Sequence, residues 1–274
     1  MATRICFDRP IPPEHKLEAA RLAASENKRN EPSTLMLPAG ASFHPMKMAL
    51  ITGKRWANAR KLGVHFLDGS KKQRTLTQKY ASAWTKFANV IFDYEAGPQA
   101  EIRISFVADR GSWSAVGTDA LVRAAFLLGK PTMNFGWLRD GTSETEWRRV
   151  VIHEFGHALG AIHEHQNPSG GITWNLPEVY RTFGGPPNRW TRSQIDSNIV
   201  QKYSINQLNA SKFDIKSIML YTFPASLILG GQEMPNNTDL SAGDKSFIAQ
   251  MYPKTTGVAP AASRSHPALR SAAA

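Results

Sequence analysis

The residues best suited to do chemistry lie in one short stretch between His153 and His163. His153 and His157 are four residues apart, and on a helix this spacing places both imidazoles on one face, where they can share a metal ion. Glu154 directly follows the first histidine, where its carboxylate can take a proton from a water molecule on that metal. The pattern H-E-x-x-H therefore predicts a site for metal-assisted hydrolysis.

The residues that follow extend this short pattern, which by itself also arises by chance. Gly160 can adopt the left-handed conformation that ends a helix. The chain can then turn and bring His163 back as a third nitrogen ligand. Three protein ligands leave one coordination position open for water, which is typical of catalytic rather than structural zinc. An ordinary amphipathic helix with surface histidines is the weaker interpretation.

The full pattern, H-E-x-x-H-x-x-G-x-x-H, is the signature of the metzincins. Far downstream, Ser217-Ile218-Met219-Leu220-Tyr221 resembles the Met-turn of that group, in which a methionine lies beneath the metal. Methionine is a common filler of hydrophobic cores, so Met219 gains its meaning from the upstream histidines. Glu164 after the third histidine and Tyr221 after the methionine are similar to the astacin pattern. We identify the chain as a divergent astacin-like metzincin.

This resemblance implies a zinc-dependent endopeptidase with one catalytic Zn²⁺. His153, His157 and His163 would hold the ion, and Glu154 would act as general base on a zinc-activated water. Tyr221 would stabilise the reacting carbonyl and is a possible further zinc ligand. The alternative is a zinc-bearing protein of the same fold that binds peptides without cleaving them. A silent site has no need of Glu154 or Tyr221, so their presence argues against that alternative.

Two departures from the astacin pattern make the chain divergent. The third histidine is not followed by the R-x-D-R-D extension, and Asn167-Pro168 stands there instead. The N-terminal residues also lack the F-x-G-D pattern of astacin pro-segments. Cys6 or Asp8 could plug the zinc site in its place, as thiolate or carboxylate. We favour the simpler interpretation, in which Cys6 is a free thiol without a role.

The resemblance predicts an α+β zincin fold. Its N-terminal lobe would hold a mixed twisted sheet and two long helices. Its irregular C-terminal lobe would hold the Met-turn and a closing helix, with the zinc cleft between the lobes. Alternation and turn residues predict strands at 62–67, 102–106 and 131–135. The alternation of apolar and polar residues at 102–106 indicates a half-buried strand. The spacing of apolar residues from 76 to 91 predicts one helix. Ser143 and Glu146 form a capping box for the metal-binding helix, and Ser241 caps the last helix.

Residues 111–117 resemble the astacin segment around the edge strand above the zinc. Such a strand can bind an extended protein or peptide substrate through main-chain hydrogen bonds. We therefore expect Trp113 and Ser114 to contact substrate. A hairpin with a packed tryptophan explains the same residues.

We divide the chain into an N-terminal extension, a catalytic domain and a tail. Residues 1–50 resemble a pro-segment and include a helix with Leu17, Ala20 and Ala24 on one side, followed by a linker over 30–45. Residues 51–253 form the catalytic domain, with an upper lobe at 51–163 and a lower lobe at 164–253. Residues 254–274 are rich in Ala, Ser and Pro, which predicts disorder.

Composition narrows the classes of function and the compartment. A hydrophobic content of 42% is that of a globular protein. The formal net charge of +11 could attract a nucleic acid. No nucleic-acid-binding motif accompanies this charge, so such a partner is not expected. The single cysteine excludes an intrachain disulfide. We find no signal peptide and no apolar run long enough to span a membrane. These features leave the compartment unknown, with three alternatives: a cytoplasmic protein, an unconventionally secreted protein, or a sequence that is not the full precursor.

Overall fold

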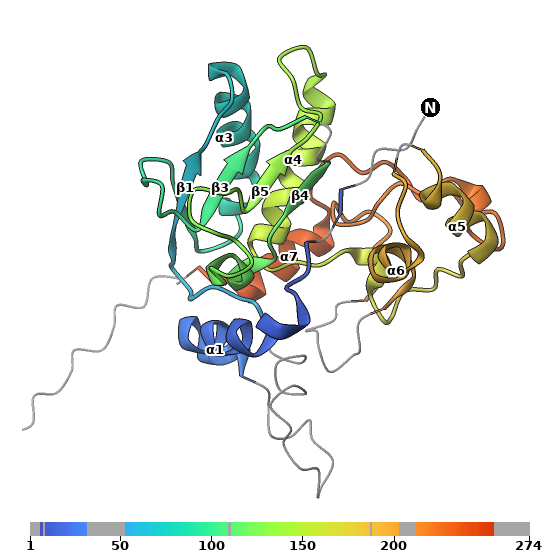
Figure 1. The fold of residues 1–274 in the computed structure, drawn as a ribbon, viewed down its shortest axis with the longest axis horizontal. Coiled ribbons are helices and arrows are strands. Elements are labelled where there is room, and N and C mark those ends of the chain that lie inside the picture. The colour runs from blue at the N-terminus through green and yellow to red at the C-terminus, as the bar shows by residue number, and fades with distance from the viewer. Residues whose placement is uncertain are drawn as a thin grey trace, which may run out of the picture.

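The computed structural model describes residues 6–7, 9–31, 53–108, 111–186, 188–202 and 212–254. Apart from the N-terminal extension, we describe these residues in two parts, which we call lobes. A sheet lobe (residues 53–163) holds the β-strands and the two longest helices, and a C-terminal lobe (residues 164–254) holds shorter helices and loops (Figure 1). The α+β architecture agrees with the fold expected from the sequence.

The sheet has five strands in the order β2-β1-β3-β5-β4. Its members are β1 (Lys61–Phe66), β2 (Ile91–Asp93), β3 (Ile102–Ser105), β4 (Ser112–Ser114) and β5 (Met133–Phe135). All neighbours are parallel except β4 and β5, which are antiparallel. The sheet is therefore mixed, and β4 is an edge strand whose outer main-chain groups can pair with another segment.

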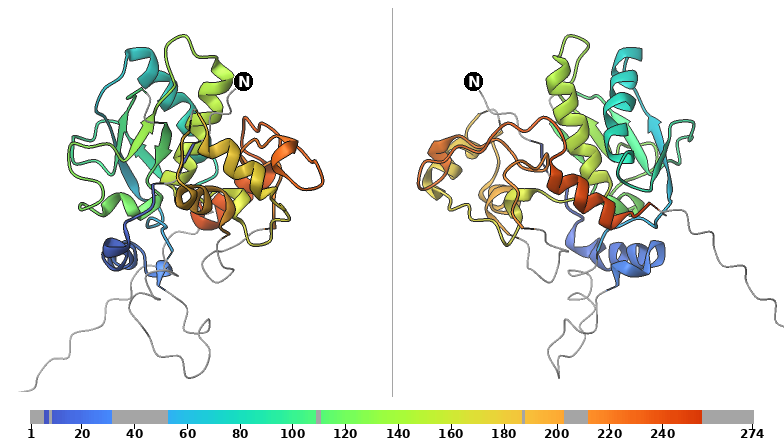
Figure 2. Two further views of the ribbon diagram at one scale, coloured as in Figure 1. Left: turned by 45° about the vertical axis from the view of Figure 1, so that its right-hand side comes forward. Right: turned by 180° about the vertical axis from the view of Figure 1, so that it is seen from behind.

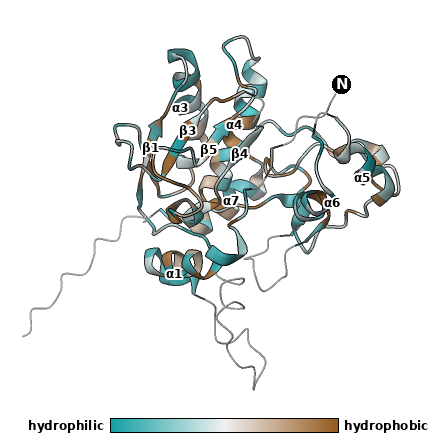
Figure 3. Cartoon of the chain, viewed as in Figure 1, coloured by the Kyte–Doolittle hydropathy of each residue, from teal (hydrophilic) through white to brown (hydrophobic). Residues whose placement is uncertain are grey.

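Two long helices, α3 (Lys71–Thr85) and α4 (Glu144–Ala158), pack side by side against one face of the sheet (Figure 2). The indole nitrogen of Trp84 on α3 donates to the carbonyl of Ile152 on α4 at 2.7 Å. Figure 3 shows teal, polar residues over much of the exposed α3 and brown, apolar stretches along the strands. Burial of the apolar faces thus fixes α4, the helix that carries His153 and His157, against the sheet.

The predicted helix over residues 76–91 is too long. α3 ends at Thr85, and Ile91 begins β2 with 58% of its surface exposed. Asn89 is the reason, because its main chain pairs with residues far away in sequence. Its N–H donates to the Tyr252 carbonyl, and its carbonyl accepts from Ala59, both at 2.8 Å. Tertiary hydrogen bonds therefore end the helix although the apolar spacing continues.

The half-buried strand predicted at 102–106 is wrong in one respect, because all of β3 is buried. The Arg103 side chain, expected on an exposed face, donates to the carbonyls of Ala100, Phe126 and Lys130 at 2.8–2.9 Å. Burial lowers the pKa of this guanidinium to about 10. The alternation predicts an exposed Arg103 surrounded by water. Main-chain carbonyls, two of them from the loop before β5, take the place of that water.

The start of α4 agrees only in part with the predicted capping box. The Ser143 hydroxyl accepts from the Glu146 N–H at 3.3 Å, as expected of an N-cap. The Glu146 carboxylate instead binds both Arg149, at 2.7 and 2.8 Å, and the Trp137 indole nitrogen, at 2.8 Å. The closing helix α7 (Ala242–Met251) does have a complete box, formed by Ser241 and Asp244.

The C-terminal lobe is more helical than expected. It includes α5 (Leu176–Gly184) and α6 (Arg192–Ile195), and α6 continues into a π-helical turn over Asp196–Val200. The 3₁₀ turns of the described residues are η1 (Pro13–His15), η2 (Lys28–Asn30), η4 (Gly117–Leu121), η5 (Glu164–Gln166) and η8 (Ala225–Leu227). No helix among the described residues is long and apolar enough to cross a membrane.

The N-terminal extension folds onto the sheet lobe. Its helix α1 (Lys16–Glu26) packs against η4. Ala19 and Leu22 pack against the hydrophobic core, and Ala23 is buried. Leu17, Ala20 and Ala24, which the sequence places on one side of this helix, are half-buried.

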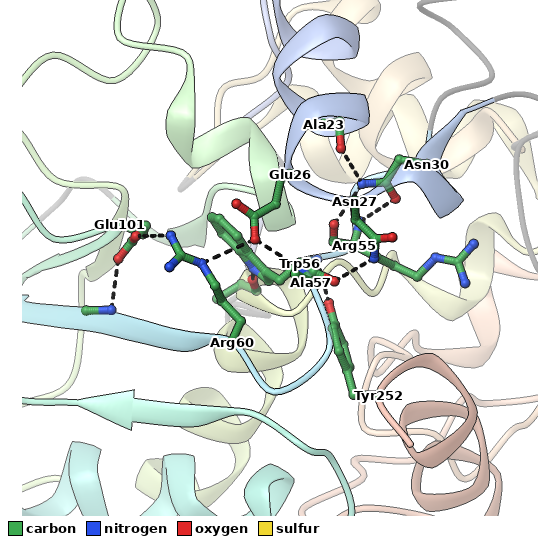
Figure 4. A network of polar contacts seen from close by, with 12 residues as sticks. Ala23, Glu26, Asn27, Asn30, Arg55, Trp56, Ala57, Arg60, Glu101 and Tyr252 are labelled. Atoms are coloured by element: carbon green, nitrogen blue, oxygen red, sulfur yellow. Dashed lines mark hydrogen bonds and ion pairs between the residues drawn. The ribbon is translucent and has the colours of Figure 1, made fainter. Parts of the chain in front are cut away.

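Side chains after α1 fasten the extension to residues 53–57 (Figure 4). Asn30, predicted to begin a linker, is 1% exposed. Its side chain donates to the Ala23 and Arg55 carbonyls at 2.8 and 2.7 Å and accepts from the Arg55 N–H at 2.9 Å. The Asn27 side chain donates to the Trp56 carbonyl at 2.7 Å. The predicted linker from residue 32 onward, and the predicted tail beyond Lys254, lie outside the described residues.

We predict that Asn30→Ala loosens the extension. The substitution removes the Asn30 side chain from two part-buried main-chain groups of Arg55, which costs about 1–3 kcal/mol. Amide hydrogen exchange in α1 should therefore become faster. Lys28→Ala, at an exposed position of the same turn, is the matched control. Unchanged exchange in Asn30→Ala would show that other contacts hold the extension.

Candidate active site

Three histidines converge at one buried point. The Nε2 atom of His157 lies 3.1 Å from Nε2 of His153 and 2.9 Å from Nε2 of His163. The three side chains are at most 2% exposed. His153 and His157 come from the last two turns of α4, and His163 follows the turn after it. The structure therefore brings together the three residues that the sequence predicts as zinc ligands.

Main-chain carbonyls orient two of these rings. The Nδ1 atom of His153 lies 2.8 Å from the Ile218 carbonyl, and Nδ1 of His157 lies 2.9 Å from the Ala161 carbonyl. A carbonyl only accepts, so Nδ1 carries the proton and Nε2 presents a lone pair. Burial, together with the neighbouring His157 and His163, holds the pKa of His153 well below its usual range. Neutral imidazoles with converging lone pairs fit Zn²⁺.

The turn after α4 has the geometry that the sequence predicts. Gly160 has a φ of +93°, in the left-handed region that glycine adopts without strain. A side chain at Gly160 would also approach the Lys54 carbonyl, with its Cβ 3.0 Å from that oxygen. Glycine is thus needed for both the turn and the close approach, and the turn delivers His163.

The loop with Met219 and Tyr221 reaches the site from the C-terminal lobe. The Tyr221 hydroxyl contacts Nε2 of His163, and its ring lies 4.2 Å from the His163 ring. Met219 packs under α4, where its sulfur would lie 2.5 Å from a Cβ at Gly156. Asp244 of α7 holds the loop, accepting from the Ser217 hydroxyl at 2.6 Å and the Ile218 N–H at 2.8 Å.

Glu154 and Cys6 meet beside the histidines. Both are buried, and the ligand atoms of Cys6, His153 and Glu154 lie within 4.8 Å of one another. Burial, and then the negative charge of Glu154, raise the pKa of the Cys6 thiol well above its ordinary value. The Tyr221 hydroxyl donates to the Cys6 carbonyl. The extension thus reaches the predicted active site, although Asp8, the alternative plug, lies outside the described residues.

Phe7 and Arg9, two described residues of the extension, contact the edge strand β4. The Phe7 N–H donates to the Ser112 carbonyl at 3.1 Å. The Arg9 guanidinium lies 4.4 Å from the centre of the Trp113 ring. Ser114, the other predicted substrate contact, is 1% exposed, and its hydroxyl donates to the Ala115 carbonyl. The structure therefore brings Trp113 next to the extension and leaves the Ser114 side chain among buried residues.

Sequence reasoning missed the side chain of Trp190. It expected main-chain pairing along residues 111–117, which include Ser112, but it did not predict that the N-terminal extension would pair there. Trp190 follows α5 in a segment without a motif, and its ring lies 6.4 Å from the Phe7 ring. These residues meet only because the two lobes and the extension pack together.

We predict that Gly156→Ala disturbs the packing beneath the histidines. The new methyl group would meet the Met219 sulfur at 2.5 Å and the Trp84 ring at 2.9 Å. Overpacking of this kind costs about 1–3 kcal/mol. Thermal unfolding should show the loss, and Gly141→Ala, where a Cβ meets nothing within 4 Å, is the control. Equal transition temperatures for the two variants would contradict the packing described here.

The structure was compared with known proteins. No family model matches the sequence, and no curated protein matches it. A solved structure of myroilysin is similar, with 40% identity, a TM-score of 0.71 and coverage of 75% of this chain and 98% of that chain. A second crystal structure of myroilysin has 37% identity, a TM-score of 0.57 and coverage of 83% and 96%.

A third similar structure is high choriolytic enzyme 1, a hatching-enzyme zinc protease from the medaka fish Oryzias latipes. It has 19% identity, a TM-score of 0.46 and coverage of 74% of this chain and 94% of that chain, so the family assignment rests on the first two structures. With the three converging histidines, those matches show that this chain belongs to the astacin-like metzincins and is a zinc-dependent endopeptidase.

Proposed function

We propose that this chain cleaves peptide bonds at the buried point where the three Nε2 atoms meet. The observation that carries the proposal is that Glu154 lies beside His153 and Tyr221 beside His163, two of the three converging histidines. His153, His157 and His163 would hold the zinc ion. When bound, zinc supplies a Lewis acid that polarises the scissile carbonyl and acidifies water.

Glu154 acts as the general base and acid. Its carboxylate is fully buried beside His153, where little water competes for the proton it takes from the attacking water. It then passes this proton to the leaving amine. Because Glu154 follows His153 on the same helix, its distance from the histidines is set by α4.

Tyr221 stabilises the negative charge that develops on the carbonyl oxygen, because its hydroxyl is a hydrogen-bond donor beside His163. The contact with the Cys6 carbonyl supports this role, since the hydroxyl already donates to a peptide carbonyl at this place. Met219 supports the site from below by packing against Gly156, in the manner of a Met-turn.

The substrate binds extended along the outer side of β4. The hydrogen bond from Phe7 to the Ser112 carbonyl supports this binding mode, because in it a main-chain N–H from outside the sheet pairs with the edge strand. Main-chain pairing does not depend on side chains, so many sequences could bind this way.

The extension holds the enzyme in a latent state, with the Cys6 thiol covering the site. This proposal replaces the simpler interpretation of Cys6 as a free thiol without a role. It rests on the burial of Cys6 against His153 and Glu154 and on the contact between its carbonyl and Tyr221.

Variants at Glu154 and Tyr221 test the catalytic roles. Glu154→Ala should keep its zinc, measured by atomic absorption, and lose most of its activity, because the proton acceptor is gone. Tyr221→Phe should also keep zinc but lose about 10²-fold in kcat, as removal of one oxyanion donor does. Cleavage is measured by a mass-spectrometric digest of an unfolded protein.

Two results would contradict these roles. Loss of zinc from Glu154→Ala would make Glu154 a ligand, and full activity of Tyr221→Phe would remove Tyr221 from the reaction. If wild type and Cys6→Ser both bind zinc but cleave nothing, the result favours the alternative function, a zinc-bearing protein that binds peptides without cleaving them.

Latency is tested with Cys6→Ser in the full chain. The substitution should weaken the binding of the extension to the site. A loss of about 1.4 kcal/mol of that binding free energy raises the fraction of molecules with an uncovered site about tenfold, so the initial digestion rate should rise by about that factor. Ser25→Ala, at an exposed position of α1, is the control within the extension and should digest at the wild-type rate. Equal rates for Cys6→Ser and wild type would leave the thiol without a role.

A further inference from the structure

The extension occupies the place of a substrate at the active site. The Cys6 carbonyl accepts a hydrogen bond from the Tyr221 hydroxyl, which we propose donates to the reacting carbonyl of a substrate. The next residue, Phe7, pairs with β4. Phe7 therefore lies where a substrate residue close to the scissile bond would lie. This inference rests on the proposed function, because it uses the proposed role of Tyr221.

The Phe7 ring has a defined partner in the C-terminal lobe. It meets the Trp190 ring edge to face, with centres 6.4 Å apart and planes at 76°. Trp190 is itself anchored, because it stacks on the buried Phe183 at 5.6 Å and its main-chain N–H donates to the Phe183 carbonyl at 3.0 Å. The indole is thus positioned by α5 independently of the extension.

On its other side the ring lies against main chain. A Cβ at Gly111 would lie 2.4 Å from Cε1 of Phe7, and Gly111 has a φ of +64°. Gly136 lies directly behind, since a Cβ there would lie 2.3 Å from the Gly111 carbonyl. The two glycines leave room that a smaller side chain at position 7 would not fill.

We propose that Gly111, Ser112 and Trp190 form a subsite for a large aromatic side chain of the substrate, within two residues of the scissile bond. Phe7 fills this subsite in the resting chain. The main-chain bond to Ser112 sets the position of the residue, and the ring contact with Trp190 selects its side chain. The enzyme should then prefer phenylalanine, tyrosine or tryptophan at one position near the cut.

The first test maps cleavage sites. The full chain with Cys6→Ser and Phe7→Ala, which opens the subsite, digests an unfolded protein, and mass spectrometry identifies the cut bonds. One position within two residues of the cut should favour aromatic residues over alanine by about tenfold, the lower range for a hydrophobic pocket. Adding Trp190→Ala should abolish the preference. Leu176→Ala, an exposed apolar truncation on α5 in the same lobe, should preserve it.

The second test measures binding without cleavage. Glu154→Gln is added to the same chain, and fluorescence polarisation follows labelled peptides that differ only in phenylalanine or alanine at the favoured position. If the digest shows no cleavage, a set with phenylalanine at each of six positions is used instead. The best phenylalanine peptide should bind about tenfold more tightly than the alanine peptide, and Trp190→Ala should remove the difference.

The outcomes separate this inference from the proposed function. Cleavage without an aromatic preference, or with one that Trp190→Ala leaves intact, overturns the subsite and leaves the endopeptidase in place. Binding that does not distinguish phenylalanine from alanine overturns it as well. Absence of cleavage together with Trp190-dependent binding of phenylalanine overturns the catalytic proposal and supports the subsite.

Discussion

The convergence of three imidazole nitrogens on one buried point is the constraint on which the rest of the structure depends. Lone pairs about 3 Å apart repel one another until a cation lies between them, so the chain must hold them in place. Two hydrogen bonds orient the rings, one to the carbonyl of Ile218 and one to that of Ala161. Each carbonyl therefore becomes part of the active site.

Those two carbonyls explain much of the surrounding architecture. Ala161 is in place because Gly160 turns the chain in the left-handed region. Ile218 is in place because Asp244, at the start of α7, binds its N–H and the hydroxyl of Ser217. The closing helix thus acts on the site from a distance, through the loop that also carries Met219 and Tyr221.

The extension uses the same features that we propose for a substrate. It lies on the outer edge of β4, its Cys6 carbonyl accepts from Tyr221, and its Phe7 ring contacts Trp190. The Asn30 network fastens its other end to the start of the sheet lobe (Figure 4). A segment that resembles a substrate and is anchored far from the reacting bond can cover the site, because the anchor offsets the entropy of ordering it.

Local chemistry in the sequence determined the catalytic core. The spacing of His153 and His157, the turn at Gly160 and the caps at Ser143 and Ser241 act within a few residues, so pattern alone predicts them. The structure alone decided what depends on contacts between distant segments. Asn89 ends α3 through Ala59 and Tyr252, and Arg103 is buried by carbonyls that include those of Phe126 and Lys130 in a later loop. The meeting of Cys6 with Glu154, and of Phe7 with Trp190, joins residues more than a hundred positions apart. No local pattern encodes such pairs, because packing of the whole chain chooses them.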